Sequence, residues 1–216
     1  MAIYLIRHGE TASNRSRVVQ FPETPLSERG IAQARQLGAR TADLGITRIL
    51  TSDMARAKMT AEAVEAATGA PLSLDSDLQE RNFGDHRGTP YTELIEQGIE
   101  LFAPDFDPPN GESWNRFHER VDRAWANACR IAESLEGHLA LVTHGLVCHS
   151  IAARLADVPA SLLSPASYGR NGPPIRFGNT AISRLEGPSP WHFELFACTV
   201  HLDGVTADDG SSLSGI

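Results

Sequence analysis

Short apolar runs alternate with amphipathic segments along this 216-residue chain, and the alternation constrains the fold more than any other feature. The apolar runs have the length and composition of strands, whereas the segments between them carry apolar residues at helical spacing. Strands are predicted at 3–7, 46–52, 72–74, 139–143, 180–185 and 191–200, and helices at 28–44, 53–68, 91–99, 113–135 and 146–155. Strands that alternate with helices form a largely parallel sheet with helices on both faces. We therefore predict an α/β fold, a three-layer α/β/α sandwich with a mostly parallel central sheet.

Length and composition indicate one domain. A chain of 216 residues, of which 41% are hydrophobic, can bury a single substantial core. No internal repeat divides it. The last residues are polar, acidic and rich in glycine, a composition that favours disorder. We expect one domain at 1–201 and a flexible C-terminal tail at 202–216.

The charge of the chain limits its partners. Counting 19 Lys and Arg against 27 Asp and Glu gives a formal net charge of −8. A surface of this sign repels nucleic acids and anionic bilayers, so neither is an expected partner. An anionic substrate must instead be attracted by a local cluster of arginines.

Cysteine usage and hydropathy indicate a reducing compartment. Cys129, Cys148 and Cys198 have no close spacing, which fits neither a disulfide framework nor a zinc site. The first apolar run follows no basic leader, and no run reaches the roughly 20 residues of a membrane helix. A cytoplasmic location is therefore expected, without a metal site. The oligomeric state stays open, with a homodimer as one option.

Two histidines directly follow predicted strands. The segment RHG at 7–9 comes after the apolar run 2–6, and HG at 144–145 comes after 139–143. The carboxyl ends of parallel strands meet at one edge of a sheet, where ligands of α/β proteins bind. A guanidinium beside an imidazole at that edge places a phosphate-binding cation next to a candidate nucleophile. On its own the pattern also fits a structural histidine.

Four segments, in order and at matching spacing, resemble the histidine phosphatase superfamily, branch 1, whose members are phosphoglycerate mutase-like. They are RHGET at 7–11 with Asn14, SDMARA at 52–57, LQERNFG at 78–84 and VTHG at 142–145. The resemblance covers most of the chain. It implies the phosphoglycerate mutase-like form of the predicted sandwich and turns the strand-end histidines into site candidates.

The resemblance also implies a role for each side chain. His8 would attack phosphorus in its neutral form and become transiently phosphorylated. Glu80 would protonate the leaving group and later deprotonate water, with Arg81 opposing the rise in its pKa. No metal or other cofactor is implied, because protein donors neutralise the phosphoryl oxygens. Catalysis is expected from Arg7, His8, Arg56, Glu80 and His144, and substrate binding from Arg7, Asn14, Arg56, His144 and Gly145.

Residues near these motifs receive plainer expectations. Glu10 suits the start of a helix or turn better than proton transfer. Arg15 and Arg17 are expected in solvent. Whether His86 and Arg87 touch the substrate is left open by the sequence.

Three functions are compatible with this pattern. A phosphatase passes the phosphoryl group to water and a mutase passes it to a second hydroxyl. Mutases of this family carry an insert with arginines before the Gly-Glu-Ser segment, whereas 104–110 is short and has none, although Arg116 and Arg120 could partly substitute. Hydrolysis of a phosphomonoester of a small metabolite is favoured. Cofactor-dependent phosphoglycerate mutase is the alternative, and a non-catalytic phosphate-binding module is the third reading.

The substrate itself is not predicted. Its identity depends on loops, and loop sequence alone names no ligand. These loops are expected at 21–25, 85–91, 103–111 and 164–178.

Overall fold

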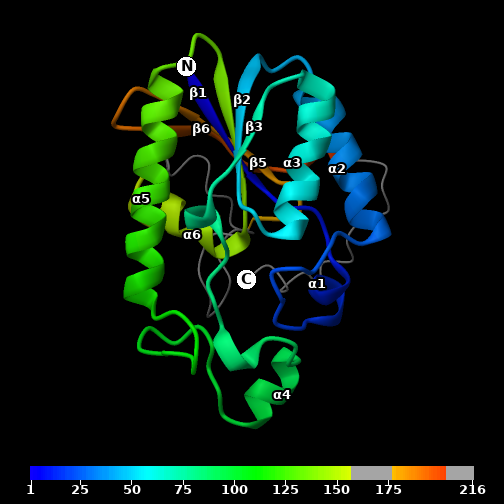
Figure 1. Ribbon diagram of the computed structural model, residues 1–216, viewed down its shortest axis with the longest axis vertical. Coiled ribbons are helices and arrows are strands. Elements are labelled where there is room, and N and C mark those ends of the chain that lie inside the picture. Colours follow the sequence, from blue (N-terminus) through cyan, green and yellow to red (C-terminus); the bar gives the residue numbers. More distant parts are fainter. Residues whose placement is uncertain (157–176, 203–216) are drawn as a thin grey trace.

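The computed structural model describes residues 1–156 and 177–202 (Figure 1). Residues 157–176, which include most of the loop predicted at 164–178, and the predicted tail from residue 203 onward lie outside the described residues.

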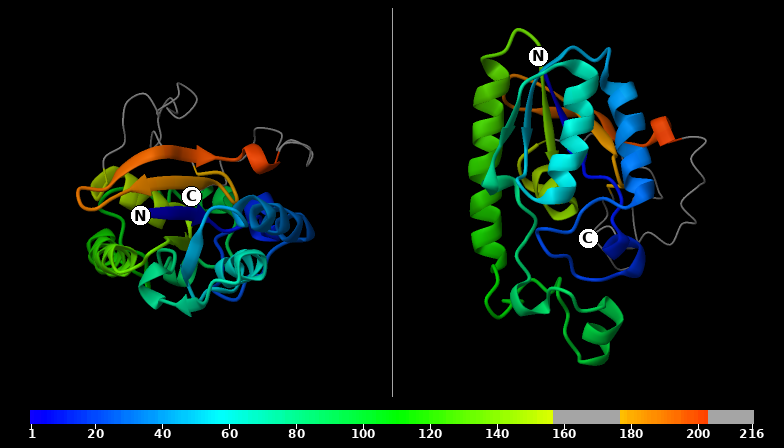
Figure 2. Two further views of the ribbon diagram at one scale, coloured as in Figure 1. Left: turned by 90° about the horizontal axis from the view of Figure 1, so that it is seen from above. Right: turned by 45° about the vertical axis from the view of Figure 1, so that its right-hand side comes forward.

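A six-stranded sheet in the order β3-β2-β4-β1-β5-β6 forms the centre of the molecule. Its strands are β1 (Ala2–Arg7), β2 (Ile46–Thr51), β3 (Leu72–Leu74), β4 (His138–Thr143), β5 (Ile182–Glu186) and β6 (His192–Cys198). The strands β1 to β4 pair in parallel, whereas β5 is antiparallel to β1 and β6 is antiparallel to β5. Figure 2 shows this antiparallel pair, in orange, at one edge of the sheet. The prediction of a mostly parallel sheet is confirmed.

Helices cover both faces of the sheet. The α-helices of the described residues are α1 (Ala12–Ser16), α2 (Glu28–Thr41), α3 (Ala55–Thr68), α4 (Tyr91–Glu96), α5 (Trp114–Glu133) and α6 (Gly145–Arg154), of which α2, α3, α5 and α6 form the two outer layers. Figure 1 shows α2 and α3 on one side of the sheet and α5 and α6 on the other.

Strand β1 shows why its sequence is apolar throughout. Ile3 and Leu5 lie in a core that includes residues of α5 and α6, whereas Tyr4 and Ile6 lie in a second core with residues of α2 and α3. Successive side chains of a strand point to opposite faces, so a strand covered on both faces needs a continuous apolar run. The two cores confirm the three-layer sandwich.

Local chemistry sets the ends of the helices. The side chains of Ser27 and Ser113 accept hydrogen bonds from the backbone N–H groups of Gly30 and Arg116, which caps α2 and α5. Helix α3 ends at Gly69, whose φ of 71° is the left-handed conformation that glycine adopts without strain.

The stretch 10–27, for which neither a strand nor a helix was predicted, contains the short helix α1. A capping box starts it: the Thr11 hydroxyl accepts from the N–H of Asn14, and Oδ1 of Asn14 accepts from the N–H of Thr11. Asn14 is the one buried residue of α1. Apolar periodicity therefore could not predict this helix.

Between β3 and α5 the chain leaves the sheet and forms the segment 76–113, which carries α4 at the far end of the molecule in Figure 1. The buried guanidinium of Arg81 holds this segment together. It donates to the carbonyls of Leu101, Phe106 and Glu112, and its Cζ lies 3.9 Å from the ring centroid of Trp114. The segment is thereby fixed to the start of α5.

Candidate active site

Three neighbouring strands, β2, β4 and β1, bring polar side chains to one edge of the sheet. The N–H of His8 donates to the Thr143 carbonyl at 2.9 Å, and the N–H of Ser52 donates to the Val142 carbonyl at 3.1 Å. Parallel pairing thus continues one residue beyond each strand. The ring centroids of His8 and His144 lie 5.2 Å apart. The structure places the two histidines at matching strand ends.

The surroundings of His8 fix its tautomer and its charge. Nδ1 lies 2.6 Å from the carbonyl oxygen of Gly9, and a carbonyl can only accept, so the ring proton belongs on Nδ1. Burial lowers the pKa of His8 well below its ordinary value, and the charges of Arg56 and Arg7 lower it further. At neutral pH the ring is uncharged, and the lone pair is on Nε2.

His144 is fully buried against His8. Its Nε2 lies 2.9 Å from Oγ of Ser52. The Ser52 hydroxyl accepts a hydrogen bond from the N–H of Met54 and can donate its own hydrogen bond to Nε2 of His144. Burial, followed by the charge of Arg56, lowers the pKa of His144 well below its ordinary value. A neutral ring of this tautomer carries its proton on Nδ1, which is buried and has no hydrogen-bond partner among the described residues. His144 is therefore able to donate to an oxyanion.

Two buried arginines lie beside His8. Arg7 and Arg56 are each 2% exposed, and burial lowers the pKa of Arg56 to about 10, which keeps it charged at neutral pH. Nη1 of Arg56 donates to the Phe21 carbonyl at 3.0 Å, and Nη1 of Arg7 donates to the Phe177 carbonyl. Nε of Arg56 is buried without a partner in the described part of the chain, so it can donate to a bound anion.

The carboxyl group of Glu80 lies at the N-terminus of α6. Oε2 accepts from the N–H of Leu146 at 3.1 Å, and Oε1 accepts from the N–H of Arg81 at 3.0 Å. Burial raises the pKa of Glu80, although these two amides and the charges of Arg56 and Arg7 oppose the rise. The guanidinium of Arg81 donates to three backbone carbonyls. The groups that oppose the rise in the Glu80 pKa are therefore chiefly the two amides, Arg56 and Arg7, and not the charge of Arg81 as expected.

These groups surround a pocket of about 20 Å³, here called the phosphate pocket. It is lined by Arg7, His8, Val19, Gln20, Met54, Arg56, Glu80, Arg81, Phe83, Arg87 and Tyr91. Four of the predicted catalytic residues thus share one pocket. Its arginines concentrate positive charge in a chain whose formal net charge is −8.

Like His144, the predicted substrate-binding residues Asn14 and Gly145 do not line this pocket. Oδ1 of Asn14 accepts from Thr11, and it lies 3.5 Å from Nδ2 of Asn179, which also donates to the His8 carbonyl. Gly145 is the first residue of α6, directly after His144. Asn14 thus supports the loop around His8, and contact of either residue with a substrate stays a prediction.

Glu10 holds the start of α2, in line with the expectation of a structural role. Its carboxylate accepts from the Ser27 hydroxyl at 2.8 Å and pairs with Arg29 at 3.3 Å. Arg15 and Arg17 are exposed as predicted, but Arg17 also lines a second pocket.

Sequence reasoning did not single out several residues of the site, among them Ser52 and Tyr91, and left Arg87 open. Ser52, quoted only as part of a motif, could have been found from its place at the end of β2 beside His144. Tyr91 lines the phosphate pocket, and no pattern in the sequence marks it. Arg87 lines the pocket as well, whereas the ring of His86 lies 5.7 Å from that of Phe106.

Within residues 1–156 and 177–202, no group of three His, Cys, Asp or Glu side chains is arranged to hold a metal ion. In the same ranges no helix combines the length and the apolar character that crossing a bilayer requires.

Comparison with known proteins gives consistent matches. The family model for the histidine phosphatase superfamily (branch 1) matches residues 3–187. The chain is 30% identical to Probable phosphoglycerate mutase GpmB of Salmonella arizonae, over 97% of this chain and 98% of that protein.

Two solved structures are also similar. One is a candidate alpha-ribazole-5′-P phosphatase from Escherichia coli, 26% identical, with a TM-score of 0.72 over 91% of this chain and 95% of that one. The other is a mycobacterial glucosyl-3-phosphoglycerate phosphatase, 24% identical, with a TM-score of 0.74 over 92% of this chain and 99% of that one. The second likeness shows the fold alone.

Proposed function

This chain belongs to the histidine phosphatase superfamily, branch 1, and from that premise we propose that it hydrolyses a phosphomonoester of a small metabolite through a phosphohistidine on His8. Members of the superfamily are phosphatases or mutases. The observation that carries the proposal is one pocket in which a neutral His8, a Glu80 of raised pKa and two buried arginines meet.

In the first step the Nε2 lone pair of His8 attacks phosphorus, and the bond from phosphorus to the ester oxygen breaks. The departing alkoxide takes the proton of Glu80 and leaves as an alcohol. Negative charge on the three remaining phosphoryl oxygens is stabilised by the guanidinium groups of Arg7 and Arg56 and by the N–H of His144.

In the second step Glu80, now a carboxylate, accepts a proton from water. The oxygen of that water bonds to phosphorus, and the electron pair of the broken N–P bond returns to Nε2 of His8. Inorganic phosphate leaves, and Glu80 is again protonated for the next substrate.

A phosphoglycerate mutase is the second candidate, favoured by the identity to Probable phosphoglycerate mutase GpmB. A mutase must hold a phosphorylated sugar acid while the phosphoryl group changes position. The suggested substitute clamp does not support this, because Arg120 is bound to Glu112 by hydrogen bonds of 2.9 and 2.7 Å and donates to two backbone carbonyls. Arg116 is exposed and lines neither pocket. Hydrolysis needs no such clamp.

The test is phosphate release by the purified protein in EDTA. We expect turnover of p-nitrophenyl phosphate and of some members of a panel of sugar phosphates and phosphoglycerates. His8→Ala should lower kcat by at least about 10³-fold and remove the acid-labile phosphoenzyme seen after rapid quenching. The exposed His192 provides the matched control, because His192→Ala removes an imidazole that does not line the pocket.

Each alternative predicts a different result. Turnover retained by folded His8→Ala would remove the nucleophile assignment. Phosphoryl transfer between the hydroxyls of phosphoglycerate, faster than phosphate release, would identify a mutase. Phosphate binding without turnover of any ester would identify the non-catalytic module.

A further inference from the structure

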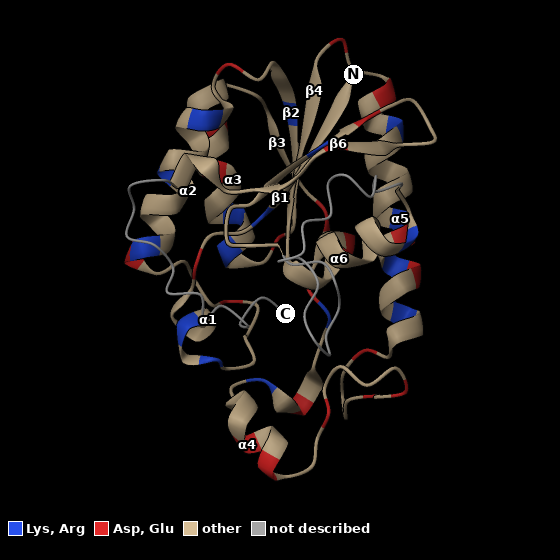
Figure 3. Cartoon of the chain, turned by 180° about the vertical axis from the view of Figure 1, so that it is seen from behind, with Lys and Arg blue, Asp and Glu red and all other residues tan. Residues whose placement is uncertain are grey.

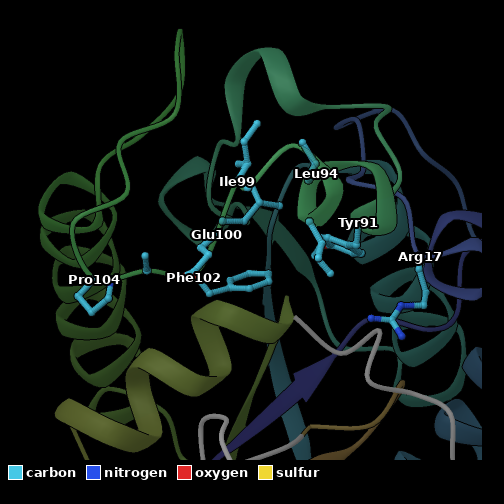
Figure 4. A pocket seen from close by; sticks show the side chains of 11 residues that line it. Arg17, Tyr91, Leu94, Ile99, Glu100, Phe102 and Pro104 are labelled. Atoms are coloured by element: carbon cyan, nitrogen blue, oxygen red, sulfur yellow. The ribbon is translucent and has the colours of Figure 1, made fainter.

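A second, larger pocket of about 620 Å³ opens between α4 and the residues that follow it (Figure 4). It is lined by Arg17, Tyr91, Leu94, Ile95, Gly98, Ile99, Glu100, Leu101, Phe102, Ala103 and Pro104, and is here called the α4 pocket. Its volume lies within the range of pockets that bind small molecules, about 300–1,000 Å³. The phosphate pocket, by contrast, has a volume of only about 20 Å³.

Tyr91 joins the two pockets, because its side chain lines both. Burial, and after it the charge of Glu80, raises the pKa of Tyr91 to about 12, with Arg7 and Arg17 among the charges that oppose the rise. The Tyr91 ring therefore lies within electrostatic reach of both sites. Phe102, which lines the α4 pocket, connects them a second time. Its ring centroid lies 6.1 Å from that of Tyr91 and 5.9 Å from that of Phe83, a residue of the phosphate pocket.

The lining of the α4 pocket is apolar and has no net charge. Leu94 and Leu101 are buried in the core, whereas Ile95 and Phe102 are 68% and 37% exposed. Exposed apolar side chains that share one hollow mark a binding site more often than isolated ones do. In Figure 4, Tyr91 lies between Arg17 and the apolar side chains.

The charged groups of the lining are Arg17 and Glu100, one of each sign. A carboxylate at the apolar end disfavours an anionic ligand there. The pocket is thus suited to a neutral molecule with an apolar surface.

We propose that the α4 pocket binds the alcohol part of the substrate, and that this alcohol is neutral and apolar, an alkyl or aryl alcohol instead of a sugar acid. The proposal rests on the phosphatase function proposed above. With the phosphoryl group against His8, the ester oxygen faces Glu80, and the carbon chain continues past Tyr91 into the apolar hollow.

The test is a homologous series of n-alkyl phosphates, from ethyl to octyl phosphate. All members have nearly the same leaving-group acidity, so differences in kcat/KM report binding of the chain. We expect kcat/KM to rise by up to about fourfold for each methylene that the pocket covers, and octyl phosphate to exceed glycerol phosphate and 3-phosphoglycerate.

Two variants, one in α4 and one at the residue directly after it, test whether the alkyl chain binds in the α4 pocket. Ile95→Glu places a carboxylate in the pocket and should flatten the rise for the longer chains while ethyl phosphate changes by less than about threefold. Gln97→Glu adds the same charge to an exposed residue outside the lining and should keep the rise. Both substitutions are at exposed positions, so neither should prevent folding.

Failure of this inference differs from failure of the proposed function. If p-nitrophenyl phosphate and ethyl phosphate are hydrolysed but kcat/KM is flat along the series, or is highest for 3-phosphoglycerate, the apolar-alcohol assignment is wrong and the phosphatase stands. A rise that Ile95→Glu leaves intact would place the alkyl chain elsewhere. If no ester is hydrolysed, both proposals fall.

Discussion

At the scale of single residues, burial sets the protonation states that the proposed chemistry needs. Removing a group from water disfavours its charged form, so the pKa of His8 falls and that of Glu80 rises. The reactive form is the neutral one in each case, a nucleophile for His8 and an acid for Glu80. One physical effect thus prepares both partners. The nearby arginines support the neutral His8 but oppose the neutral Glu80.

These shifts predict a bell-shaped pH profile of kcat/KM. Activity should rise with pH as His8 loses its proton, well below the ordinary histidine value of 6.5, and fall again as Glu80 loses its proton, above the ordinary value of 4.5. In Glu80→Gln the alkaline fall should disappear. Ionisation of the substrate affects both enzymes alike, so the difference between the two profiles reports Glu80. An unchanged alkaline limb would assign it to another group.

Glu80→Gln also predicts a dependence on the leaving group. The value of kcat/KM covers the steps up to the phosphohistidine, in which Glu80 protonates the alcohol oxygen. We expect a loss of about 10²–10⁴-fold for an alkyl phosphate. The loss for p-nitrophenyl phosphate should be much smaller, because nitrophenolate leaves without a proton. Equal losses for the two esters would exclude Glu80 as the general acid.

At the scale of elements, the segment 76–113 depends on Arg81. Replacing it with Met leaves one buried and two half-buried carbonyls without this donor, and we expect the free energy of unfolding to fall by about 3 kcal/mol. Arg81→Lys should not restore it, because an ammonium cannot reproduce the planar fork. Hydrogen exchange should quicken around α4 and the residues after it. Urea titration measures the loss, with the exposed Arg130→Met as control; a loss no larger than the control's would contradict this role.

The elements themselves were largely predictable. Strand β1, whose apolar run must fill two cores, and helix α5, with its serine cap and long apolar stripe, were identified from pattern alone. The strand-end placement of His8 and His144 followed from the same reasoning. The motif resemblance then supplied Arg56 and Glu80.

Contacts between distant segments were not predictable. The Glu80 carboxyl depends on amides of its own loop and of α6, 66 residues away, and no local pattern encodes that pairing. Helix α1 is stabilised by a polar capping box, so the apolar period that reveals other helices is missing. The α4 pocket forms between α4 and the residues that follow it, with the distant Arg17 at its edge, so its shape depends on how this segment folds and is not visible in the loop sequence.

At the scale of the whole molecule, charged side chains lie mainly on the outer helices, whereas burial controls the titration of five histidines. Figure 3 shows both signs along the outer helices, while the strands are mostly uncharged. Burial lowers the pKa of His8, His118, His138, His144 and His149. The unfolded chain therefore binds more protons than the folded chain below pH 6.5. Glu80 has the opposite effect, because its pKa is raised in the folded chain, but it is one group against five histidines.

Stability should therefore fall as the pH is lowered from 7 to 5. Each fully buried histidine contributes up to about 1.4 kcal/mol per pH unit in the window between its lowered pKa and 6.5. His144→Gln should reduce this slope by up to that amount, because it removes one fully buried imidazole. Urea midpoints measured across the pH range give the slopes. A slope that is unchanged in His144→Gln would mean that His144 does not titrate below its ordinary value.

The place of β1 in the sheet also affects how the chain folds as it is synthesised. Both neighbours of β1, β4 and β5, are made more than a hundred residues later. Ribosomes add about 5–20 residues per second, so β1 waits on the order of ten seconds for its first partner. During that time an apolar strand with two unpaired edges is exposed to other chains. Its sequence, AIYLIR, therefore offers an apolar template for unwanted strand pairing until β4 has been made.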